Sequence, residues 1–483
     1  MPVNRGVVPL KNYDVAIIGA GTSGLSARRE VARLTDNYVV IDDGELGTTC
    51  ARVGCMPSKV LIQVAEDFHR RRHYDAIGIT GGEDLAIDTT RVMSHVRSLR
   101  DRFVRGVRSD MESWVGDHLL RKRARFTDPN TLDLGDEQIR AERIVIATGS
   151  TPIIPGPWQP YRKYLTDTDQ FFELPKLPDS IGIIGLGVIG LELGLALARL
   201  GIRVEAVTLD KAFGGLTDPF LQEYCYEQFK KEMPIHLQAV TGLGEDNTQL
   251  KIQLEDGQSL SVDSALVTMG RRPNLAGLGI EELGIPTDRG IPEFDKNTFR
   301  VSGTPWYIAG DVNGTRPVLH EAADEGRIAG YNSVRSEDQC FRRRTPLMIT
   351  FSSPNVAMVG ETHKALTERN ADFVTGSVSY EGQGRAIVKL EECGELHVYV
   401  GREDGLILGA EMLAPNGEHL AHLLAWAASA GLNVHQVLSL PFYHPVLEEG
   451  LRTALRDAAA QTWTALSPLE VLRCSDPPVG VQV

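Results

Sequence analysis

The stretch YDVAIIGAGTSG, residues 13–24, decides the fold of the N-terminal part of the chain. Its first six residues are mostly apolar and predict a buried strand, while the residues after Gly24 begin a helix. Gly19 permits the tight turn between them, Gly21 lets a pyrophosphate approach the helix N-terminus, and Gly24 allows the helix to pack on the strand. Strand, glycines and helix together predict a dinucleotide-binding unit.

The next apolar stretch, YVVI at residues 38–41, predicts a second strand that ends at Asp42, about 20 residues beyond the glycines. A carboxylate at this place accepts hydrogen bonds from both hydroxyls of a ribose. The acid completes the pattern of a dinucleotide site, which a glycine-rich turn alone would not do.

A second fingerprint of the same kind follows the apolar strand SIGII, residues 180–184. Its glycines are Gly185, Gly187 and Gly190, and an apolar helix comes after them. Two such units in one chain predict two cofactors. One can be a resident flavin and the other a diffusing nicotinamide. A disulfide would be the next group in the electron-transfer chain.

Two cysteines lie in the stretch CARVGCMPSK, which begins at Cys50 and follows the first unit. Cys50 and Cys55 can close a disulfide if the chain bends, and Gly54 supplies a bend. Pro57 suits the first turn of the helix that Ser58 is predicted to begin. A thiolate at a helix N-terminus has a lowered pKa and is more reactive. The pair alone leaves open the alternative of two buried, inert cysteines.

Over nearly its whole length the chain resembles the FAD-dependent pyridine nucleotide–disulfide oxidoreductases, and within them the dihydrolipoamide dehydrogenases. Besides the two fingerprints and the cysteine pair, four further motifs carry this resemblance. They are IATGS at 146–150, VTMGRRPN at 267–274, YIAGDV at 307–312 and HPVLEE at 444–449. The resemblance implies a homodimer that binds FAD and NAD and uses a redox-active disulfide between Cys50 and Cys55.

The resemblance also implies distinct roles for the reacting side chains. Cys55 is expected to be the charge-transfer thiol beside the flavin, and Cys50 the interchange thiol that meets the substrate. His444 is expected to act as the acid/base in the other subunit's active site, held by Glu449. Thiol–disulfide exchange needs such a proton carrier in any case, and a carboxylate fixes the ring and its tautomer.

Lys59 and Glu192 are predicted to form an ion pair. Lys59 lies one turn beyond Cys55, and Glu192 is an acid in an otherwise apolar helix. Both charges would be costly to bury apart, and pairing removes most of that cost. By the resemblance this pair lies near flavin N5, where a cation stabilises the reduced cofactor.

The predicted cofactor-binding residues fall into two sets. Those for FAD are Gly19, Gly21, Gly24, Asp42, Gly47, Thr49, Lys59, Thr148, Gly149 and Asp311. Those for the nicotinamide nucleotide are Gly185, Gly187, Gly190, Thr208 and Gly270.

Four positions depart from the family pattern. Thr48 stands in place of a glycine, Arg52 in place of an asparagine, and Val446 in place of a threonine. Thr208 stands where an NAD enzyme usually has an acid, and Asp210 comes two residues late. Because no arginine pair is present to receive a 2′-phosphate, NAD is preferred, and NADP is not excluded.

The expected fold is α/β, with two Rossmann-like domains, the second inserted in the first, and a C-terminal α+β dimerisation domain. A chain of 483 residues, 42% of them hydrophobic, is too long for one core. The expected parts are the first FAD part (1–150), the NAD(P) domain (151–275), the second FAD part (276–350), the dimerisation domain (351–465) and a flexible tail (466–483).

Composition excludes several classes of protein. A net charge of −14 argues against a nucleic-acid surface. The longest apolar run, residues 181–200, contains Glu192, Arg199 and the phosphate-binding glycines, so no membrane span is expected. No cysteine–histidine cluster has zinc spacing, and no metal site is predicted. Without an N-terminal signal, and with one disulfide-like cysteine pair, a cytoplasmic location is expected.

Three functions follow from these observations. The leading one is oxidation of dihydrolipoyl groups, on a protein or as a small molecule, with hydride transfer to NAD+. The second is NAD(P)H-dependent reduction of another disulfide, such as a glutathione-like one, or of a metal ion. The vicinal C-terminal cysteines of mercuric reductases are absent, since Cys474 stands alone. The third is a non-catalytic flavoprotein subunit.

Overall fold

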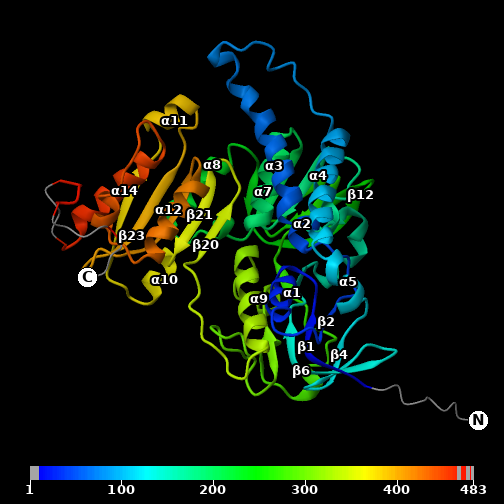
Figure 1. The fold of residues 1–483 in the computed structure, drawn as a ribbon. Coiled ribbons are helices and arrows are strands. Elements are labelled where there is room, and N and C mark those ends of the chain that lie inside the picture. Colours follow the sequence, from blue (N-terminus) through cyan, green and yellow to red (C-terminus); the bar gives the residue numbers. More distant parts are fainter. Residues whose placement is uncertain (1–9, 465–468, 475–478, 480–483) are drawn as a thin grey trace, which may run out of the picture.

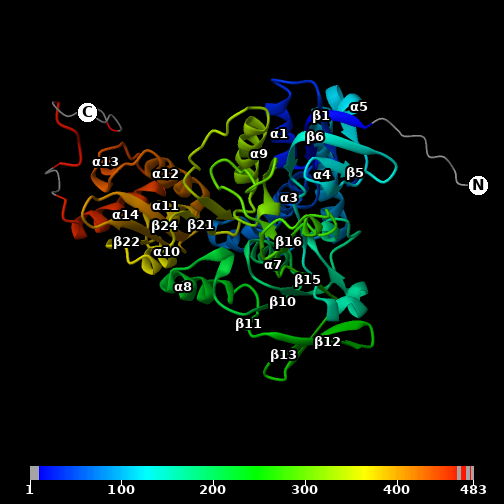
Figure 2. The same cartoon turned by 90° about the horizontal axis from the view of Figure 1, so that it is seen from below.

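The computed structural model describes residues 10–464, 469–474 and 479. The first nine residues of the chain, and most of the expected flexible tail, lie outside this range. Three main sheets form three domains, and the C-terminal domain lies to one side of the two nucleotide domains (Figures 1 and 2). The predicted fold class is confirmed.

The first nucleotide domain is built on a mostly parallel sheet with the order β3-β2-β1-β6-β5-β4, and β19 pairs with β6. Its strands are β1 (Lys11–Ile18), β2 (Tyr38–Ile41), β3 (Leu119–Leu120), β4 (Arg125–Asp128), β5 (Thr131–Asp133), β6 (Gln138–Ile146) and β19 (Trp306–Ile308). Because β19 follows the second nucleotide domain in the chain, the sheet is completed only after the chain has formed that inserted domain.

Helices α1 (Thr22–Val31) and α9 (Leu319–Ser333) pack closely against each other in this domain. A Cβ atom on Gly326 would lie 2.2 Å from the carbonyl oxygen of Ser23, and one on Gly330 would lie 2.4 Å from that of Ala27. Only glycine fits at these two positions, so small residues allow the returning helix to dock on the first one.

The cysteine stretch and a long helical pair follow β2. The helices are α2 (Thr49–Val53), α3 (Cys55–His69), α4 (Thr89–Ser109) and α5 (Glu112–His118). Apolar residues of α3 and α4 share one core with those of the second nucleotide domain. The cysteine helices are therefore wedged between the two nucleotide domains.

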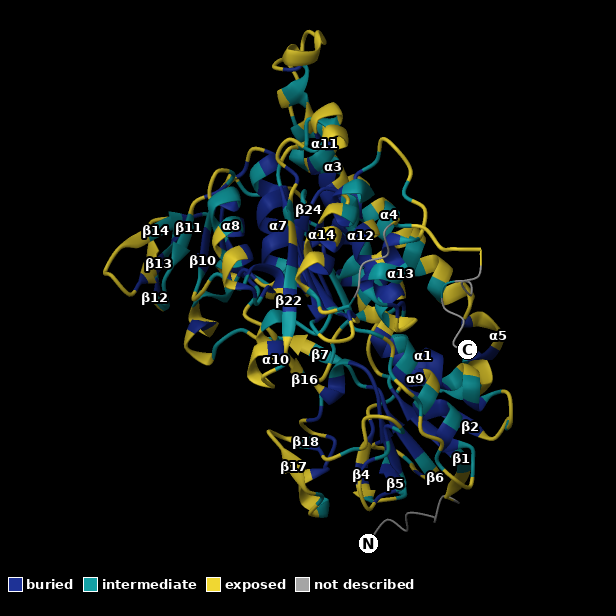
Figure 3. Cartoon of the chain, turned by 90° about the vertical axis from the view of Figure 1, so that its left-hand side faces the viewer, coloured by how far each residue is buried: buried dark blue, intermediate teal, exposed yellow. Residues whose placement is uncertain are grey.

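The second nucleotide domain has a parallel sheet with the order β11-β10-β9-β15-β8. Its strands are β8 (Leu165–Thr166), β9 (Ser180–Ile184), β10 (Arg203–Thr208), β11 (Ile235–Leu237) and β15 (Ser264–Val267), and its main helices are α7 (Val188–Arg199) and α8 (Pro219–Phe229). Helix α7 is buried along most of its length (Figure 3).

Two smaller sheets complete this domain. The strands β12 (Val240–Asp246), β13 (Gln249–Leu254) and β14 (Ser259–Val262) form an antiparallel sheet. The strands β7 (Ser150–Pro152) and β16 (Arg271–Pro273) pair where the chain enters and leaves the domain, so the two crossings are joined side by side.

The C-terminal domain is an antiparallel sheet with the order β20-β21-β24-β23-β22. Its strands are β20 (Leu347–Thr350), β21 (Asn355–Gly360), β22 (Phe373–Ser379), β23 (Glu395–Gly401) and β24 (Ile407–Ala414). Its helices are α10 (His363–Glu368), α11 (Gly384–Lys389), α12 (Gly417–Ser429), α13 (Val434–Leu438) and α14 (Glu448–Gln461). Helices α12 and α14 pack on the sheet and bury its apolar side chains.

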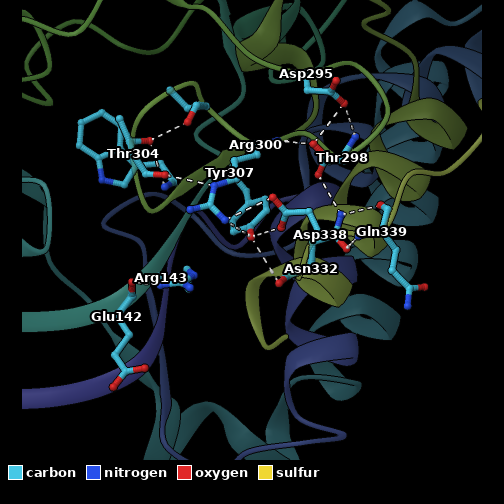
Figure 4. A network of polar contacts seen from close by, with 12 residues as sticks. Glu142, Arg143, Asp295, Thr298, Arg300, Thr304, Tyr307, Asn332, Asp338 and Gln339 are labelled. Carbon is cyan, nitrogen blue, oxygen red and sulfur yellow. Dashed lines mark hydrogen bonds and ion pairs between the residues drawn. The ribbon is translucent and has the colours of Figure 1, made fainter. Parts of the chain in front are cut away.

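A polar network fixes the start of the connection between α9 and the C-terminal domain (Figure 4). The Tyr307 hydroxyl donates to Asp338 Oδ1 at 2.6 Å, and Arg300 donates to Asp338 Oδ2 at 3.2 Å. The Asn332 amide donates to the carbonyls of Thr298 and Gln339. Burial, followed by the hydrogen bond to Asp338, raises the pKa of Tyr307 to about 12, so its proton stays in place. The connection thus leaves the first nucleotide domain from a fixed point.

Candidate active site

The two predicted redox cysteines lie on consecutive helices. Cys50 is in α2 and Cys55 is the first residue of α3, with Gly54 between the helices in a bent conformation (φ −128°, ψ −113°). The prediction that α3 begins at Ser58 was wrong by three residues. Pro57 falls in the first turn, where a missing N–H costs nothing, so the helix extends back to Cys55.

The thiols of Cys50 and Cys55 are free and hydrogen-bonded to each other. This bond lowers the pKa of Cys55 to about 7, helped by the positive charge of Lys59 and opposed by burial. The same bond, together with burial, raises the pKa of Cys50. In the reduced pair the negative charge therefore belongs on Cys55, and Cys50 keeps its proton.

Lys59 and Glu192 form the predicted ion pair. The Lys59 ammonium lies 2.9 Å from both carboxylate oxygens of Glu192, whose residue is 3% exposed. Phe351 also contributes, although no motif in the sequence marks it. Its N–H donates to Glu192 Oε1 at 2.9 Å, and its ring centroid lies 4.6 Å from the ammonium. The pair joins α3, α7 and the end of β20.

The first glycine loop has the shape that a pyrophosphate needs. Gly19 has φ +111°, and a Cβ there would lie 2.3 Å from the Ala147 carbonyl oxygen. A Cβ on Gly24 would lie 1.8 Å from the carbonyl oxygen of Gly19, whereas one on Gly21 would meet no atom within 4 Å. The loop is thus closely packed on two sides and open at Gly21, above the N-terminus of α1.

The second glycine loop repeats this geometry. Gly185 has φ +100°, a Cβ on Gly190 would lie 1.9 Å from the Gly185 carbonyl oxygen, and the space beside Gly187 is open. The residues of both loops therefore fit the diphosphate of a dinucleotide, one in each nucleotide domain.

Acidic side chains lie beside the first loop. Asp42 accepts hydrogen bonds from the N–H groups of Ala20 (2.6 Å) and Gly44 (2.7 Å), which fixes its carboxylate at the end of β2. Asp311 Oδ2 accepts from the Ser150 hydroxyl at 2.8 Å, a contact that the sequence does not predict. Both carboxylates keep lone pairs for ribose or ribityl hydroxyls.

The remaining predicted cofactor residues shape the backbone near these groups. Gly47, Gly149 and Gly270 have φ values of +127°, +69° and +104°, which glycine adopts without strain. The Thr148 hydroxyl donates to the Asn274 carbonyl at 2.7 Å, so it joins the segments that leave the two nucleotide sheets. Thr49 is exposed at the first position of α2.

Thr208 ends β10, where the predicted ribose contact belongs. Asp210 Oδ1 accepts the N–H of Ala212 at 2.9 Å, so this carboxylate stabilises its own loop. A hydroxyl is thus the polar group at the predicted ribose position, as the sequence indicates.

Two departures from the family pattern surround the cysteines. Thr48 has φ +62° and ψ +149°, a backbone conformation that favours glycine, and its hydroxyl accepts the Ala51 N–H at 3.3 Å at the start of α2. Arg52 forms an ion pair with Glu45 at 2.8 Å, and its side chain packs over Gly47. Arg52 therefore closes the loop that precedes Cys50.

His444 and Glu449 form the predicted pair on the C-terminal domain. His444 Nδ1 lies 2.9 Å from Glu449 Oε1, and Glu449 Oε2 accepts the Val446 N–H at 3.2 Å. The hydrogen bond with His444 lowers the pKa of Glu449. The His444 side chain is 80% exposed, and within the described ranges it contacts neither cysteine of its own chain.

Neither a membrane span nor a metal cluster is found in the described part of the chain. No helix there is long and apolar enough to cross a bilayer. No group of three or more His, Cys, Asp or Glu side chains there has the arrangement of a metal site.

Comparison with known proteins identifies the family. Residues 13–326 match the model of the pyridine nucleotide-disulphide oxidoreductases, and residues 347–455 match the dimerisation domain of these enzymes. The chain belongs to the pyridine nucleotide-disulphide oxidoreductase family. The expected cofactors, FAD and NAD, are those of this family, and the second match supports the expected homodimer.

Individual relatives carry different names. The chain is 30% identical to a dihydrolipoyl dehydrogenase of Bacillus subtilis over 450 residues, which cover 90% of this chain and 94% of the relative. It is 27% identical to a mercuric reductase of Lysinibacillus sphaericus over 470 residues, which cover 95% of this chain and 85% of the relative.

Solved structures share the fold at lower identity. LpdA from Mycobacterium tuberculosis has a TM-score of 0.79 at 23% identity, covering 92% of this chain and 99% of that one. The HOCl-induced flavoprotein disulfide reductase RclA from Escherichia coli has a TM-score of 0.78 at 22% identity, covering 93% and 99%. The family is thus established. The names of the relatives differ, so they do not by themselves identify the substrate.

Proposed function

We propose that this protein is a homodimeric dihydrolipoyl dehydrogenase, which oxidises dihydrolipoyl groups and transfers the electrons to NAD+. The observation that carries the proposal is the unequal thiol pair, in which a hydrogen bond and Lys59 place the charge on Cys55 and leave Cys50 protonated. In such a pair one sulfur can react with the substrate while the other faces the cofactor. The name of the Bacillus subtilis relative supports the choice of substrate.

Each cofactor would be held by residues already described. FAD would place its diphosphate at Gly21 and its hydroxyls at Asp42 and Asp311, and NAD would place its diphosphate at Gly187 and a ribose at Thr208. When bound, the two cofactors supply the two-electron chemistry that restores the Cys50–Cys55 disulfide after each turnover.

The chain's own residues carry out the thiol–disulfide exchange. His444 of the partner subunit takes the proton of the first substrate thiol, and the resulting thiolate attacks the sulfur of Cys50. The Cys50–Cys55 bond breaks, and Cys55 leaves as a thiolate, which its low pKa favours. The second substrate thiol, losing its proton to solvent, attacks the substrate sulfur of the mixed disulfide. Cys50 then leaves and receives the proton that His444 holds. The substrate has become a disulfide, and the cysteine pair has gained two electrons.

Steady-state kinetics of the FAD-loaded protein test this proposal. We expect NADH formation from dihydrolipoamide and NAD+, and loss of it in Cys50→Ser and in Cys55→Ser. Cys340→Ser is the matched control, because Cys340 is an exposed cysteine elsewhere in the chain. Turnover of oxidised glutathione or Hg(II) with NADPH, without turnover of dihydrolipoamide, would contradict the proposal.

The second candidate is an NAD(P)H-dependent reductase of another disulfide or of a metal ion. Thr208 favours it, because a neutral side chain at the ribose position does not repel a 2′-phosphate. The name of the Lysinibacillus relative also favours it. The same substrate panel separates the two candidates. A reducing cytoplasm suits either reaction.

A further inference from the structure

Helix α4 presents an exposed row of basic side chains. The helix holds six arginines and one aspartate in 21 residues, whereas the whole chain has a net charge of −14. At 100° per residue, Arg91, His95, Arg102 and Arg105 fall on one face, and all four are exposed. We call these four residues the basic row, and it spans about 20 Å along the helix.

The basic row is not neutralised by the chain itself. Arg97 and Arg100, on other faces of α4, bond to Leu174 and Glu173. By contrast, the side chains of Arg91, Arg102 and Arg105 make no hydrogen bond or ion pair with any residue that the structure describes. Three unpaired arginines at this spacing create a positive potential on a protein that is otherwise acidic.

The opposite face of α4 supports the cysteine site. Val92, Met93 and Val96 are buried in the core that α3 also lines. A Cβ on Gly47 would lie 2.8 Å from the Val104 side chain, so α4 packs directly on the loop that leads to Cys50. The basic row thus lies on the outer face of a helix whose inner face packs on the cysteine helices.

In the single chain, the position of α4 leaves the basic row accessible. Figures 1 and 2 place α4 on the far side of α3 from the C-terminal domain. The domain expected to form the dimer therefore does not cover this row in its own chain. A partner that docks on α4 would lie beside the redox site without displacing the C-terminal domain.

We propose that the basic row of α4 is the docking surface for a small acidic protein domain that carries the dihydrolipoyl group. This inference rests on the proposed function and names its partner. Charge complementarity selects an acidic partner and would speed its encounter. The row spans only about 20 Å, a length that favours a small domain over a long polyanion.

The test compares two substrates in one charge-reversed variant. Arg102→Glu/Arg105→Glu is assayed with free dihydrolipoamide and with a purified lipoyl-bearing domain of acidic net charge. We expect kcat/KM for the domain to fall at least about tenfold, and kcat/KM for dihydrolipoamide to stay within twofold. The wild-type rate with the domain should fall steeply with salt, and the variant should lose this dependence.

A matched variant controls for net charge. Arg140→Glu/Lys296→Glu reverses two exposed charges away from α4, and it should keep the wild-type ratio of the two substrates. If the charge reversal harms folding, Arg102→Gln/Arg105→Gln should still lower kcat/KM for the domain alone.

Several outcomes would overturn the inference. Equal loss with both substrates, or no loss with either, would remove the docking role while leaving the proposed function in place. Lack of any wild-type turnover of dihydrolipoamide would remove both. Tight binding of duplex DNA or phosphatidylserine vesicles through the same arginines, with the carrier kinetics unchanged, would assign the row to another partner.

Discussion

The ammonium of Lys59 lies 2.9 Å from the carboxylate of Glu192, although 133 residues separate them in the chain. Lys59 stands one turn beyond Cys55 in α3, and Glu192 stands on α7 of the second nucleotide domain. The pair therefore sets the charge near the thiolate and joins the cysteine helix to the domain that is expected to hold the nicotinamide. The same ion pair thus affects both the reactivity of Cys55 and the position of the second nucleotide domain.

Removal of the lysine charge should make Cys55 less acidic. Lys59 is among the causes that hold the pKa of Cys55 at about 7, so Lys59→Met should move that pKa upward, toward the ordinary thiol value of 9.0. The measurement is the anaerobic alkylation rate of the reduced protein against pH. Its midpoint should lie near pH 7 in the wild type and higher in the variant. Lys59→Arg should keep the low midpoint, and an unchanged midpoint in Lys59→Met would show that Cys50 alone sets it.

Thr48 should be a source of backbone strain. At φ +62° a β-branched residue is disfavoured, whereas glycine adopts this conformation freely. We expect Thr48→Gly to raise the free energy of unfolding by about 1 kcal/mol, after subtraction of the entropy that glycine loses and of the weak helix cap. Chemical denaturation of the FAD-loaded protein measures it. Thr48→Ala, which keeps the strain and removes the cap, should be less stable than wild type, and the reverse order of Gly and Ala would refute the strain.

If each active site contains residues of both subunits, mixing two different inactive variants should restore activity. His444 makes no contact with the cysteines of its own chain within the described ranges, and its side chain is 80% exposed. If it serves the partner, mixing Cys50→Ser with His444→Ala subunits should give heterodimers with one intact site in two. Activity should return after re-association and should require both variants. Mass spectrometry must show that heterodimers are present, because their presence without activity would place His444 outside the partner's site.

The sequence predicts the parts of the site that depend on local pattern. Strands β2 and β9 begin and end where the apolar runs do, and the two glycine loops directly follow β1 and β9. These features are local because a tight turn and a helix N-terminus need specific residues at fixed spacing.

The parts that local pattern misses depend on contacts between distant segments. Phe351 approaches Glu192 through its backbone N–H and ring, and nothing in the nearby sequence marks it. The early start of α3 at Cys55 was missed because Pro57 is compatible with several positions in a first turn. Likewise, the ion pair between Arg52 and Glu45 depends on how the loop before Cys50 folds back.

Nucleotide preference is the last property that the site allows us to predict. Thr208 offers one hydroxyl at the end of β10, while Asp210 is held by the N–H of Ala212. A hydroxyl cannot accept both ribose hydroxyls as a carboxylate does, and it does not repel a 2′-phosphate. We therefore expect a preference for NAD over NADP that is weaker than in an enzyme with the acid. Thr208→Glu should sharpen it by about 1–3 kcal/mol, the scale of a charge-assisted hydrogen bond.

The measurement is the ratio of kcat/KM for the two nucleotides in wild type and in Thr208→Glu. Thr208→Gln is the matched control, because it has the length of glutamate without the charge and should change the ratio little. A wild-type enzyme that strongly prefers NADP would contradict the prediction. It would also favour the second candidate function, because NADPH normally feeds reduction, whereas NAD+ collects electrons from a dithiol.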